Sequence, residues 1–230
     1  MSPKLLRCIE TWKMVLPDYE IKEWNESNFD FSNNIYAKQA YERKKWAFVS
    51  DYARLAILHK HGGIYLDTDV EVFKSFDPFL HHPAFVGFES DYKIGSAVIG
   101  SAANNPWISL MLLHYSKRRL VKYGFLLDMT PNTDHFTNTS KMMYGFKTDN
   151  TLQDLGDIVI YPKDYFYAKN NSIGEYTKND NTVSIHHFDA SWVGIRHKIK
   201  HKGFNFLYKI LGASIANKAL GFYKRFYTTK

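Results

Sequence analysis

The sequence predicts an α/β fold, in which a sheet is flanked by helices within a single domain. Helical and strand-like segments alternate along the chain, the strand-like segments are short and apolar, and Gly62-Gly63 separates a helix directly from a strand. With 230 residues, of which 45% are hydrophobic and 17% aromatic, the chain can bury the core of one such domain. We expect this domain to occupy residues 1–195 and a basic tail to occupy residues 196–230.

The first third of the chain reads as helix, strand and helix. Residues 5–15 predict a helix that ends before a proline, and residues 19–24 predict a strand. The polar run 25–34 predicts a turn. Residues 36–61 predict a helix with a break, and this helix should end at Gly62 because glycine favours the position that follows a helix.

The segment 64–72 joins a strand pattern to an Asp-X-Asp motif. Strand alternation sends one set of side chains to one face (Ile64, Leu66, Val70, Val72) and the acidic set to the other (Asp67, Asp69, Glu71). Two carboxylates side by side suit a hard divalent cation, Mn²⁺ or Mg²⁺, which can also hold a phosphate-bearing substrate. The alternative is a solvated strand end without a ligand.

The second half of the domain supplies further strands and two helices. A helix should start after Asn105, since asparagine caps helices and Pro106 suits the first helical position. The expected elements are strands at 85–88 and 96–100, a helix at 107–122, a loop and helix at 128–143, and strands at 158–161 and 182–188.

Asp51 and Arg54 lie three residues apart on the predicted helix 36–61, so their side chains share a face. An acid and a guanidinium presented together can accept hydrogen bonds from hydroxyl groups and bind phosphate through charge-assisted bonds. The alternative is an ordinary ion pair on the helix surface, which contributes about 0.2–1 kcal/mol.

The helix acid, the arginine, the glycine pair and the Asp-X-Asp occur in the order and spacing that resemble the signature of the DXD-containing glycosyltransferases of family 32. Residues 48–54 and 62–69 carry the central motif, 18–25 resembles the second strand of the family, and 185–192 resembles its closing His and Ser-Trp segment. The family includes yeast initiating mannosyltransferases and bacterial capsular polysaccharide enzymes, and it is distantly similar to the large clostridial glucosylating toxins.

This resemblance implies a GT-A-like fold, a Rossmann-like mixed sheet flanked by helices, whose metal site lies at the carboxyl end of a strand. Relatives generally open with a strand that lines the nucleotide-base pocket, ahead of the helix that corresponds to residues 5–15. We therefore expect the usual first strand to be absent from this chain.

The resemblance further implies a metal-dependent transferase that uses a nucleotide diphosphate sugar. The implied catalytic residues are Asp51, Arg54 and Asp67, and the implied metal ligands are Asp67, Asp69 and His186. The implied donor-binding residues are Asp51, Arg54, Tyr65, Asp67, Ser191 and Trp192. His186 and His187 should point to opposite faces of a strand, so that only one of them reaches the metal. Trp192 as an ordinary core residue is the alternative.

Retention of the anomeric configuration is also implied by the resemblance. The sequence shows no clear second carboxylate opposite Asp51 that could act as the covalent nucleophile of a double displacement. We therefore expect a front-side substitution in which the departing phosphate deprotonates the acceptor hydroxyl. The expected donor is a UDP- or GDP-sugar, and the expected acceptor is a glycan or lipid-linked glycan in bacterial surface polysaccharide synthesis.

The net charge of +7 at pH 7 is concentrated in the tail. Residues 190–230 carry nine Lys or Arg residues and no acid, which leaves −2 for the rest of the chain and argues against a nucleic-acid partner. The tail 196–230 predicts a basic amphipathic helix that either lies on an anionic membrane or packs on the core. A single cysteine, Cys8, and the lack of a long apolar run predict a cytoplasmic protein, peripheral on the inner face of the membrane where the tail binds lipid.

Two other functions stay open. Residues 66–70 satisfy the Asp-X-Asp-X-Val pattern of haloacid-dehalogenase-like phosphatases, in which the first Asp is the nucleophile. The later lysine and the tight acidic pair that such enzymes need are not evident after the strand at 158–161. The other alternative is a non-catalytic scaffold or membrane-binding protein that keeps a transferase-like fold.

Overall fold

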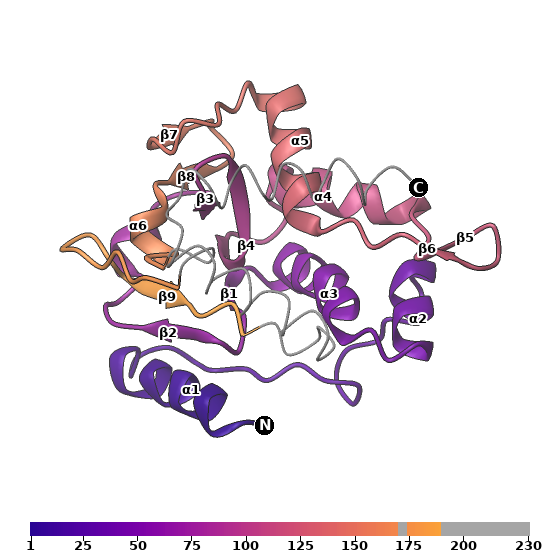
Figure 1. The fold of residues 1–230 in the computed structure, drawn as a ribbon, viewed down its shortest axis with the longest axis horizontal. Helices are drawn as coiled ribbons and strands as arrows, with labels where there is room; N and C mark the ends of the chain where they lie inside the picture. Colours follow the sequence, from indigo (N-terminus) through magenta and orange to yellow (C-terminus); the bar gives the residue numbers. More distant parts are fainter. Residues whose placement is uncertain (170–173, 190–230) are drawn as a thin grey trace, which may run out of the picture.

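The computed structural model describes residues 1–169 and 174–189. Its centre is a five-stranded sheet in the order β1 (Gly63–Leu66), β4 (Lys93–Ser101), β3 (Ala84–Ser90), β8 (Val159–Tyr161) and β7 (Gln153–Asp154) (Figure 1). The β3–β8 pair is parallel, whereas β1–β4, β3–β4 and β7–β8 are antiparallel. The sheet is therefore mixed.

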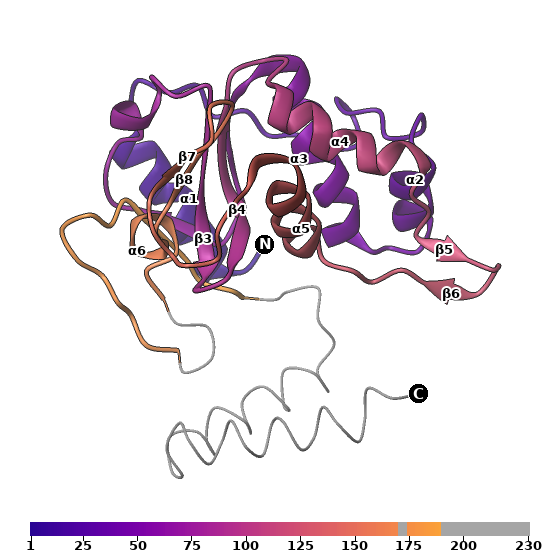
Figure 2. The same cartoon turned by 90° about the horizontal axis from the view of Figure 1, so that it is seen from above.

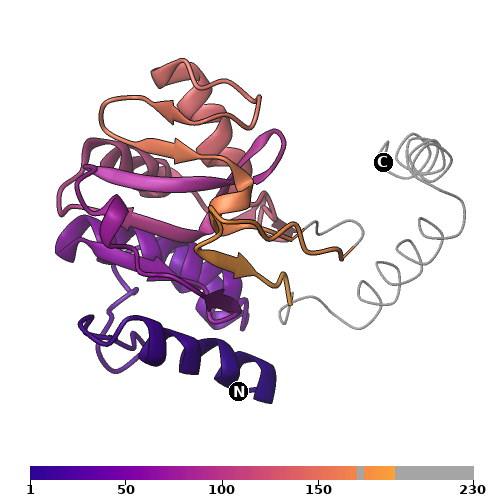
Figure 3. The ribbon, with the colours of Figure 1, turned by 90° about the vertical axis from the view of Figure 1, so that its left-hand side faces the viewer.

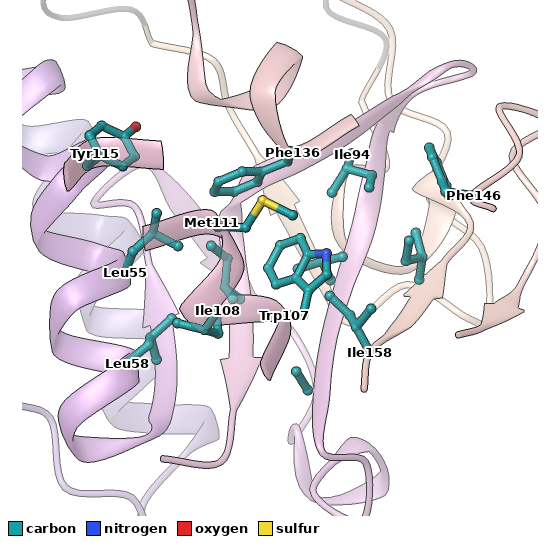
Figure 4. Packing of buried hydrophobic residues seen from close by; sticks show 14 of the residues in the cluster. Leu55, Leu58, Ile94, Trp107, Ile108, Met111, Tyr115, Phe136, Phe146 and Ile158 are labelled. Atoms are coloured by element: carbon teal, nitrogen blue, oxygen red, sulfur yellow. The ribbon is translucent and has the colours of Figure 1, made fainter. Parts of the chain in front are cut away.

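Helices cover one face of this sheet and build the larger core. They are α2 (Ile35–Glu42), α3 (Trp46–His61), α4 (Pro106–Lys117) and α5 (Asn132–Tyr144). Figure 4 shows side chains of α3, α4 and α5, among them Leu55, Trp107, Met111 and Phe136, packed against the sheet, where β4 contributes Ile94. All five are fully buried. Because each helix turns one apolar face inward, burial of this surface supplies the main stabilisation of the layer.

The other face of the sheet packs against a second, smaller core. It is formed by α1 (Pro3–Val15), β2 (Val70–Val72), the 3₁₀ helix η1 (Asp77–Phe79), α6 (Lys163–Phe166) and β9 (Ser184–His186). β2 and β9 make a separate antiparallel ribbon. α1 is the outermost element on this side (Figure 3), and it is tied to β2 because Trp12 Nε1 donates to the carbonyl of Val70 at 2.7 Å and Val72 N donates to Thr11 Oγ1 at 2.9 Å.

The predicted fold class, a mixed sheet flanked by helices in one domain, is confirmed. Among the described residues no strand precedes β1 along the chain, and no helix in this part is both long and apolar enough to cross a membrane. The amphipathic helix predicted for residues 196–230 lies outside the described residues, so it stays a prediction.

The predicted helix boundaries at Gly62 and Pro106 are confirmed. Gly62 caps α3 with φ of +66°, and a Cβ there would lie 2.9 Å from the backbone nitrogen of Ala103. Glycine is needed at this position for both reasons. Asn105 caps α4 by accepting a hydrogen bond from Ile108 N. The predicted break falls at residues 43–45, where Lys44 has φ of +54°.

Two predicted elements outside the Asp-X-Asp segment are wrong. Residues 19–24 form no strand, because within the described ranges no segment lies alongside to complete a ladder. The helix predicted to reach residue 122 ends at Lys117, and the chain turns into the hairpin β5 (Val121–Lys122) and β6 (Leu126–Leu127). Arg118 takes an extended conformation at that end, and its guanidinium reaches back to the carbonyl of Thr130 at 2.7 Å. The helix thus ends where Arg118 contacts a later segment of the chain, although the helical sequence pattern continues beyond it.

A stacked histidine pair between α4 and α5 predicts acid sensitivity. The ring centroids of His114 and His135 lie 3.7 Å apart, and the angle between the ring planes is 23°. Burial, together with the charge of His114, lowers the pKa of His135 to about 4. The unfolded chain takes up this proton near pH 6.5, so the stabilisation is complete above that pH and is lost as the pH falls towards 4.

We expect the free energy of unfolding to drop by about 1–2 kcal/mol between pH 6.5 and 4, a value reduced for the partial exposure of the ring. Urea unfolding of the protein and of His135→Gln across this range measures it. His135→Gln should flatten the dependence, whereas His61→Gln, at an exposed position at the end of α3, should not. The prediction would be contradicted if the free energy of unfolding changed equally with pH in the unchanged protein and in both variants.

Candidate metal centre

The Asp-X-Asp motif lies in a turn rather than along one strand. β1 pairs with β4 in the main sheet, while β2 pairs with β9 in the ribbon, so the chain changes sheets at residues 67–69. Asp67 N donates to Ala97 O at 2.8 Å, and Val70 N donates to Asp67 O at 2.9 Å to close the turn. The expectation of a single strand over 64–72 is therefore wrong, although both carboxylates still point to the same place.

His186 joins the two carboxylates from a distant part of the sequence. Its backbone is paired with Val70 in the β2–β9 ribbon, and its Nε2 lies 3.1 Å from Asp69 Oδ1. Asp67, Asp69 and His186 each offer one ligand atom, and these atoms all lie within 4.8 Å of one another. Two carboxylate oxygens and one imidazole nitrogen form a donor set that fits a divalent cation.

Asp69 is held in its ionised form. Burial by itself would raise the pKa of this carboxyl, but the hydrogen bond and charge of His186 lower the pKa to about 2. The backbone nitrogen of Asp189 also donates to Asp69 Oδ2 at 2.7 Å. The carboxylate is thus oriented by contacts on both oxygens.

Arg54 connects the helix α3 to the Asp-X-Asp turn. Its Nη2 lies 3.0 Å from Asp51 Oδ1, and its Nη1 lies 3.3 Å from Asp67 Oδ1. Nη1 also donates to the carbonyl of Ser96 at 2.6 Å. The side chain is 3% exposed, so this is a buried network and not the surface ion pair that the sequence left open.

Asp51 and Tyr65 complete this network. Burial raises the pKa of Asp51 to about 6, and Asp67 adds to the rise while Arg54 opposes it. The Tyr65 hydroxyl donates to Asp67 Oδ1 at 2.6 Å, and the Arg54 guanidinium stacks 4.6 Å from the ring centre. Asp51, Arg54, Tyr65 and Asp67 therefore form one connected group, and their assignment to donor binding stays a prediction.

The two neighbouring histidines diverge as strand alternation predicts. His187 Nε2 lies 2.8 Å from Glu71 Oε2, on the side away from the metal centre. Ser191 and Trp192, the other donor-binding residues expected from the sequence, lie outside the described residues. Their roles stay predictions.

Glu89, near the end of β3, is an acid at the site that the sequence interpretation missed. It comes directly after the apolar run 85–88. An acid at the end of a predicted buried strand is the signal that could have identified this residue. Burial raises the pKa of Glu89 to about 7, opposed by electrostatic interactions with His186 and Lys93 and by a hydrogen bond from Thr133. Lys93 is itself paired with Asp134, at the start of α5, at 2.5 Å.

Comparison with known proteins gives a family match for the part of the chain that carries the turn. Residues 2–86 match the family described as "Glycosyltransferase sugar-binding region containing DXD motif". This region includes α1, α3 and the Asp67–Asp69 turn, and it ends before Glu89 and His186.

A curated relative is inositol phosphoceramide mannosyltransferase 3 of Schizosaccharomyces pombe, which is 36% identical over 113 residues. The alignment covers 47% of this chain and 30% of the relative, so the chain matches less than a third of that protein. Among solved structures, the PaToxG glycosyltransferase is similar over 62% of this chain and 63% of its own length, at 20% identity and a TM-score of 0.44.

Proposed function

We propose that this chain transfers a sugar from a nucleotide diphosphate sugar to a hydroxyl acceptor, because residues 2–86 match the family described as a glycosyltransferase sugar-binding region containing a DXD motif. The observation that carries the proposal is the convergence of Asp67, Asp69 and His186 beside the buried Arg54. When the bond between the anomeric carbon and the diphosphate breaks, negative charge develops on the leaving group. A cation and preorganised positive groups at this place would offset it.

In the proposed site Asp67, Asp69 and His186 hold Mn²⁺ or Mg²⁺. The bound cation would act as a Lewis acid on the leaving diphosphate. The two carboxylates suit either metal, and the imidazole favours Mn²⁺ because Mg²⁺ prefers oxygen ligands. Asp69, with its pKa near 2, needs no deprotonation at neutral pH to serve as a ligand.

We assign Asp51 to the hydroxyl groups of the donor sugar and Arg54 to the positioning of Asp51 and Asp67. Arg54 forms ion pairs with both carboxylates, and it donates hydrogen bonds to Ser50 and to the backbone carbonyl of Ser96. These contacts fix the separation and orientation of the two carboxylates. Ser191 and Trp192 remain proposed donor-binding residues on the strength of the family resemblance. The phosphatase alternative requires Asp67 as a free nucleophile, and the contacts of Arg54 and Tyr65 to Asp67 Oδ1 weigh against it.

We propose that the transfer retains the anomeric configuration and proceeds by front-side substitution. The bond from the anomeric carbon to the diphosphate oxygen breaks while the acceptor oxygen bonds to the same face of that carbon, and the acceptor proton passes to the departing phosphate oxygen. Glu89 would hold the acceptor hydroxyl by a hydrogen bond from the side of β3 and α5. A glycosylated Glu89 or Asp51 found by mass spectrometry would instead indicate a double displacement.

Glu89→Gln is expected to lower sugar transfer to the acceptor by about ten- to a hundredfold, and transfer to water by less. The amide keeps the shape of the side chain but cannot accept a hydrogen bond with a carboxylate's strength. The measurement is the ratio of acceptor product to free sugar.

The matched control is Asp91→Asn, an exposed carboxylate two residues along the same hairpin. It should leave the ratio unchanged. Equal losses of both reactions in Glu89→Gln would contradict a role at the acceptor.

For the substrates we propose a hexose carried by UDP or GDP and a glycan or lipid-linked acceptor. The fungal relative is named as a mannosyltransferase of inositol phosphoceramide, which supports mannose as the first sugar to test and a lipid-linked acceptor as the first acceptor. A role in bacterial surface polysaccharide synthesis is a further proposal from the family resemblance.

The direct test is incubation of the protein with Mn²⁺ and a panel of UDP- and GDP-sugars, followed by measurement of released nucleotide diphosphate. Release that requires the metal is expected. Release of phosphate from a phosphomonoester would favour the phosphatase, and neither activity would favour the non-catalytic scaffold.

A further inference from the structure

One end of the molecule exposes aromatic side chains among positive charges. It consists of α2, the start of α3 and the β5–β6 hairpin, which projects from the body (Figure 2). At the hairpin tip Tyr123 is 86% exposed and Phe125 82% exposed, and Trp46 at the start of α3 is 51% exposed. Large apolar side chains gathered at such a place mark an interaction surface.

The charge of this end is strongly positive. Segments 35–46 and 117–128 hold eight Lys or Arg residues and two acids: Glu42, which is 3.7 Å from Arg43, and Asp128, which pairs with Arg118 and Lys122. Only Arg118 of the eight is buried, and the exposed or half-exposed ones are Lys38, Arg43, Lys44, Lys45, Lys117, Arg119 and Lys122. We call these seven residues, with Trp46, Tyr123 and Phe125, the basic aromatic end.

The hairpin is fixed to α2 rather than hanging free. Val121 N donates to the side-chain oxygen of Gln39 at 3.0 Å, and Arg43, one helical turn further on, donates to the backbone carbonyl of Gln39. At the tip Tyr123 and Gly124 both have positive φ, +52° and +80°, which closes the two strands with a tight turn. The aromatic tip and the basic turn 43–45 therefore lie at the same end.

We propose that the basic aromatic end binds an anionic phospholipid surface, with Tyr123 and Phe125 entering the headgroup region and the lysines and arginines above it. Aromatic rings are favoured at the boundary between lipid and water, and each basic residue near an anionic surface adds about fivefold in affinity. A projecting tip suits a deformable lipid layer better than a nucleic acid, which is bound in a groove or on a stacking platform. This inference uses no residue of the tail 196–230 and does not rest on the proposed enzymatic function.

The position of this end relates it to the metal centre. α3 starts at Trp46 and carries Asp51 five residues later, about 8 Å along the helix axis at 1.5 Å per residue.

The first test is co-sedimentation of the full chain with vesicles made of equal parts phosphatidylcholine and phosphatidylserine. The double variant Tyr123→Asn, Phe125→Ser should lower the partition coefficient by about tenfold. Asparagine is chosen because it tolerates the positive φ at position 123. Arg119→Gln should lower it by about fivefold, and pure phosphatidylcholine should bind the protein weakly.

The matched control is Tyr92→Ser, which removes an aromatic that is 60% exposed on the other hairpin, between β3 and β4. This variant should bind vesicles as the unchanged protein does. Equal binding by the double variant, or an equal loss in Tyr92→Ser, would overturn the proposal. Binding of duplex DNA that depends on the same residues, with vesicle binding unaffected, would also overturn it.

A second readout does not depend on loss of binding. The sole cysteine, Cys8, is buried, and burial raises the pKa of its thiol to about 11, so it reacts slowly with thiol reagents. Phe125→Cys can therefore be labelled selectively with a polarity-sensitive fluorophore. Its emission should shift to the blue on addition of anionic vesicles, whereas the same label on Tyr92→Cys should not. The absence of a shift at position 125 would overturn the proposed insertion of the tip.

Discussion

Asp69→Asn is expected to lower metal-dependent donor turnover by at least about a thousandfold while the protein stays folded. Asp69 is the carboxylate that faces His186 and is held ionised, so it is the ligand whose charge the cation would depend on most. An amide oxygen ligates a hard cation more weakly, and it cannot offset the positive charge. Nucleotide diphosphate release with Mn²⁺ and calorimetric Mn²⁺ binding should fall together.

The fold should survive this substitution. The lowered pKa of Asp69 corresponds to about 2 kcal/mol of stability at neutral pH, which is lost when the charge is removed. That loss is within the roughly 5–15 kcal/mol of a typical domain, so a cooperative but lower thermal transition is expected. The matched control is Glu71→Gln, two residues further on, whose carboxylate contacts His187 on the opposite side. Near-normal turnover in Asp69→Asn would remove the metal role of this residue.

Arg54→Lys is expected to reduce turnover by about a hundredfold although the charge is kept. The guanidinium reaches Asp51, Asp67 and the carbonyl of Ser96 at the same time. A lysine nitrogen is a single point and cannot reproduce this fork, so the buried Asp51 carboxylate is left with a weaker partner. Donor affinity and the rate of transfer should both fall, because Asp51 and Asp67 lose their fixed orientation.

The same substitution should lower the free energy of unfolding by about 2–3 kcal/mol, since the buried carboxylates lose the guanidinium geometry and are left with a weaker ion pair. Arg54 lowers the pKa of Asp51 because it favours the ionised carboxylate. Loss of the guanidinium contact should therefore move the pKa of Asp51 further upward. Urea unfolding at neutral pH measures the stability, and carbon NMR of the carboxyl group measures the pKa. The exposed Arg43→Lys provides the control for a lysine in place of an arginine. Wild-type stability and activity in Arg54→Lys would show that the network is incidental.

The local elements near the site were predictable because their signals lie within a few residues. Gly62 ends α3 through its positive φ, and Asn105 with Pro106 starts α4. The shared face of Asp51 and Arg54 follows from three-residue spacing on a helix. Each of these depends on hydrogen bonds between residues close in sequence.

Contacts between distant segments were predicted less well. The pattern of residues 64–72 is that of one strand, yet β1 and β2 join different sheets, because β4 and β9 offer separate partners. Residues 19–24 have a strand-like pattern but no partner among the described residues. Strand formation requires a neighbour, and local sequence does not specify which neighbour is present.

The sequence by itself determined the α/β class and the set of residue types at the site: two carboxylates on one short segment, a helical Asp–Arg pair and a histidine near the end of the sheet. Only the tertiary structure brought His186 from β9 to Asp69 and buried Arg54 between Asp51 and Asp67. It also placed Glu89 where His186 and Thr133 influence its charge. The physical reason is that helices, caps and turns are set by short-range backbone bonds, whereas burial and electrostatic environment arise when segments that are distant in the sequence pack together.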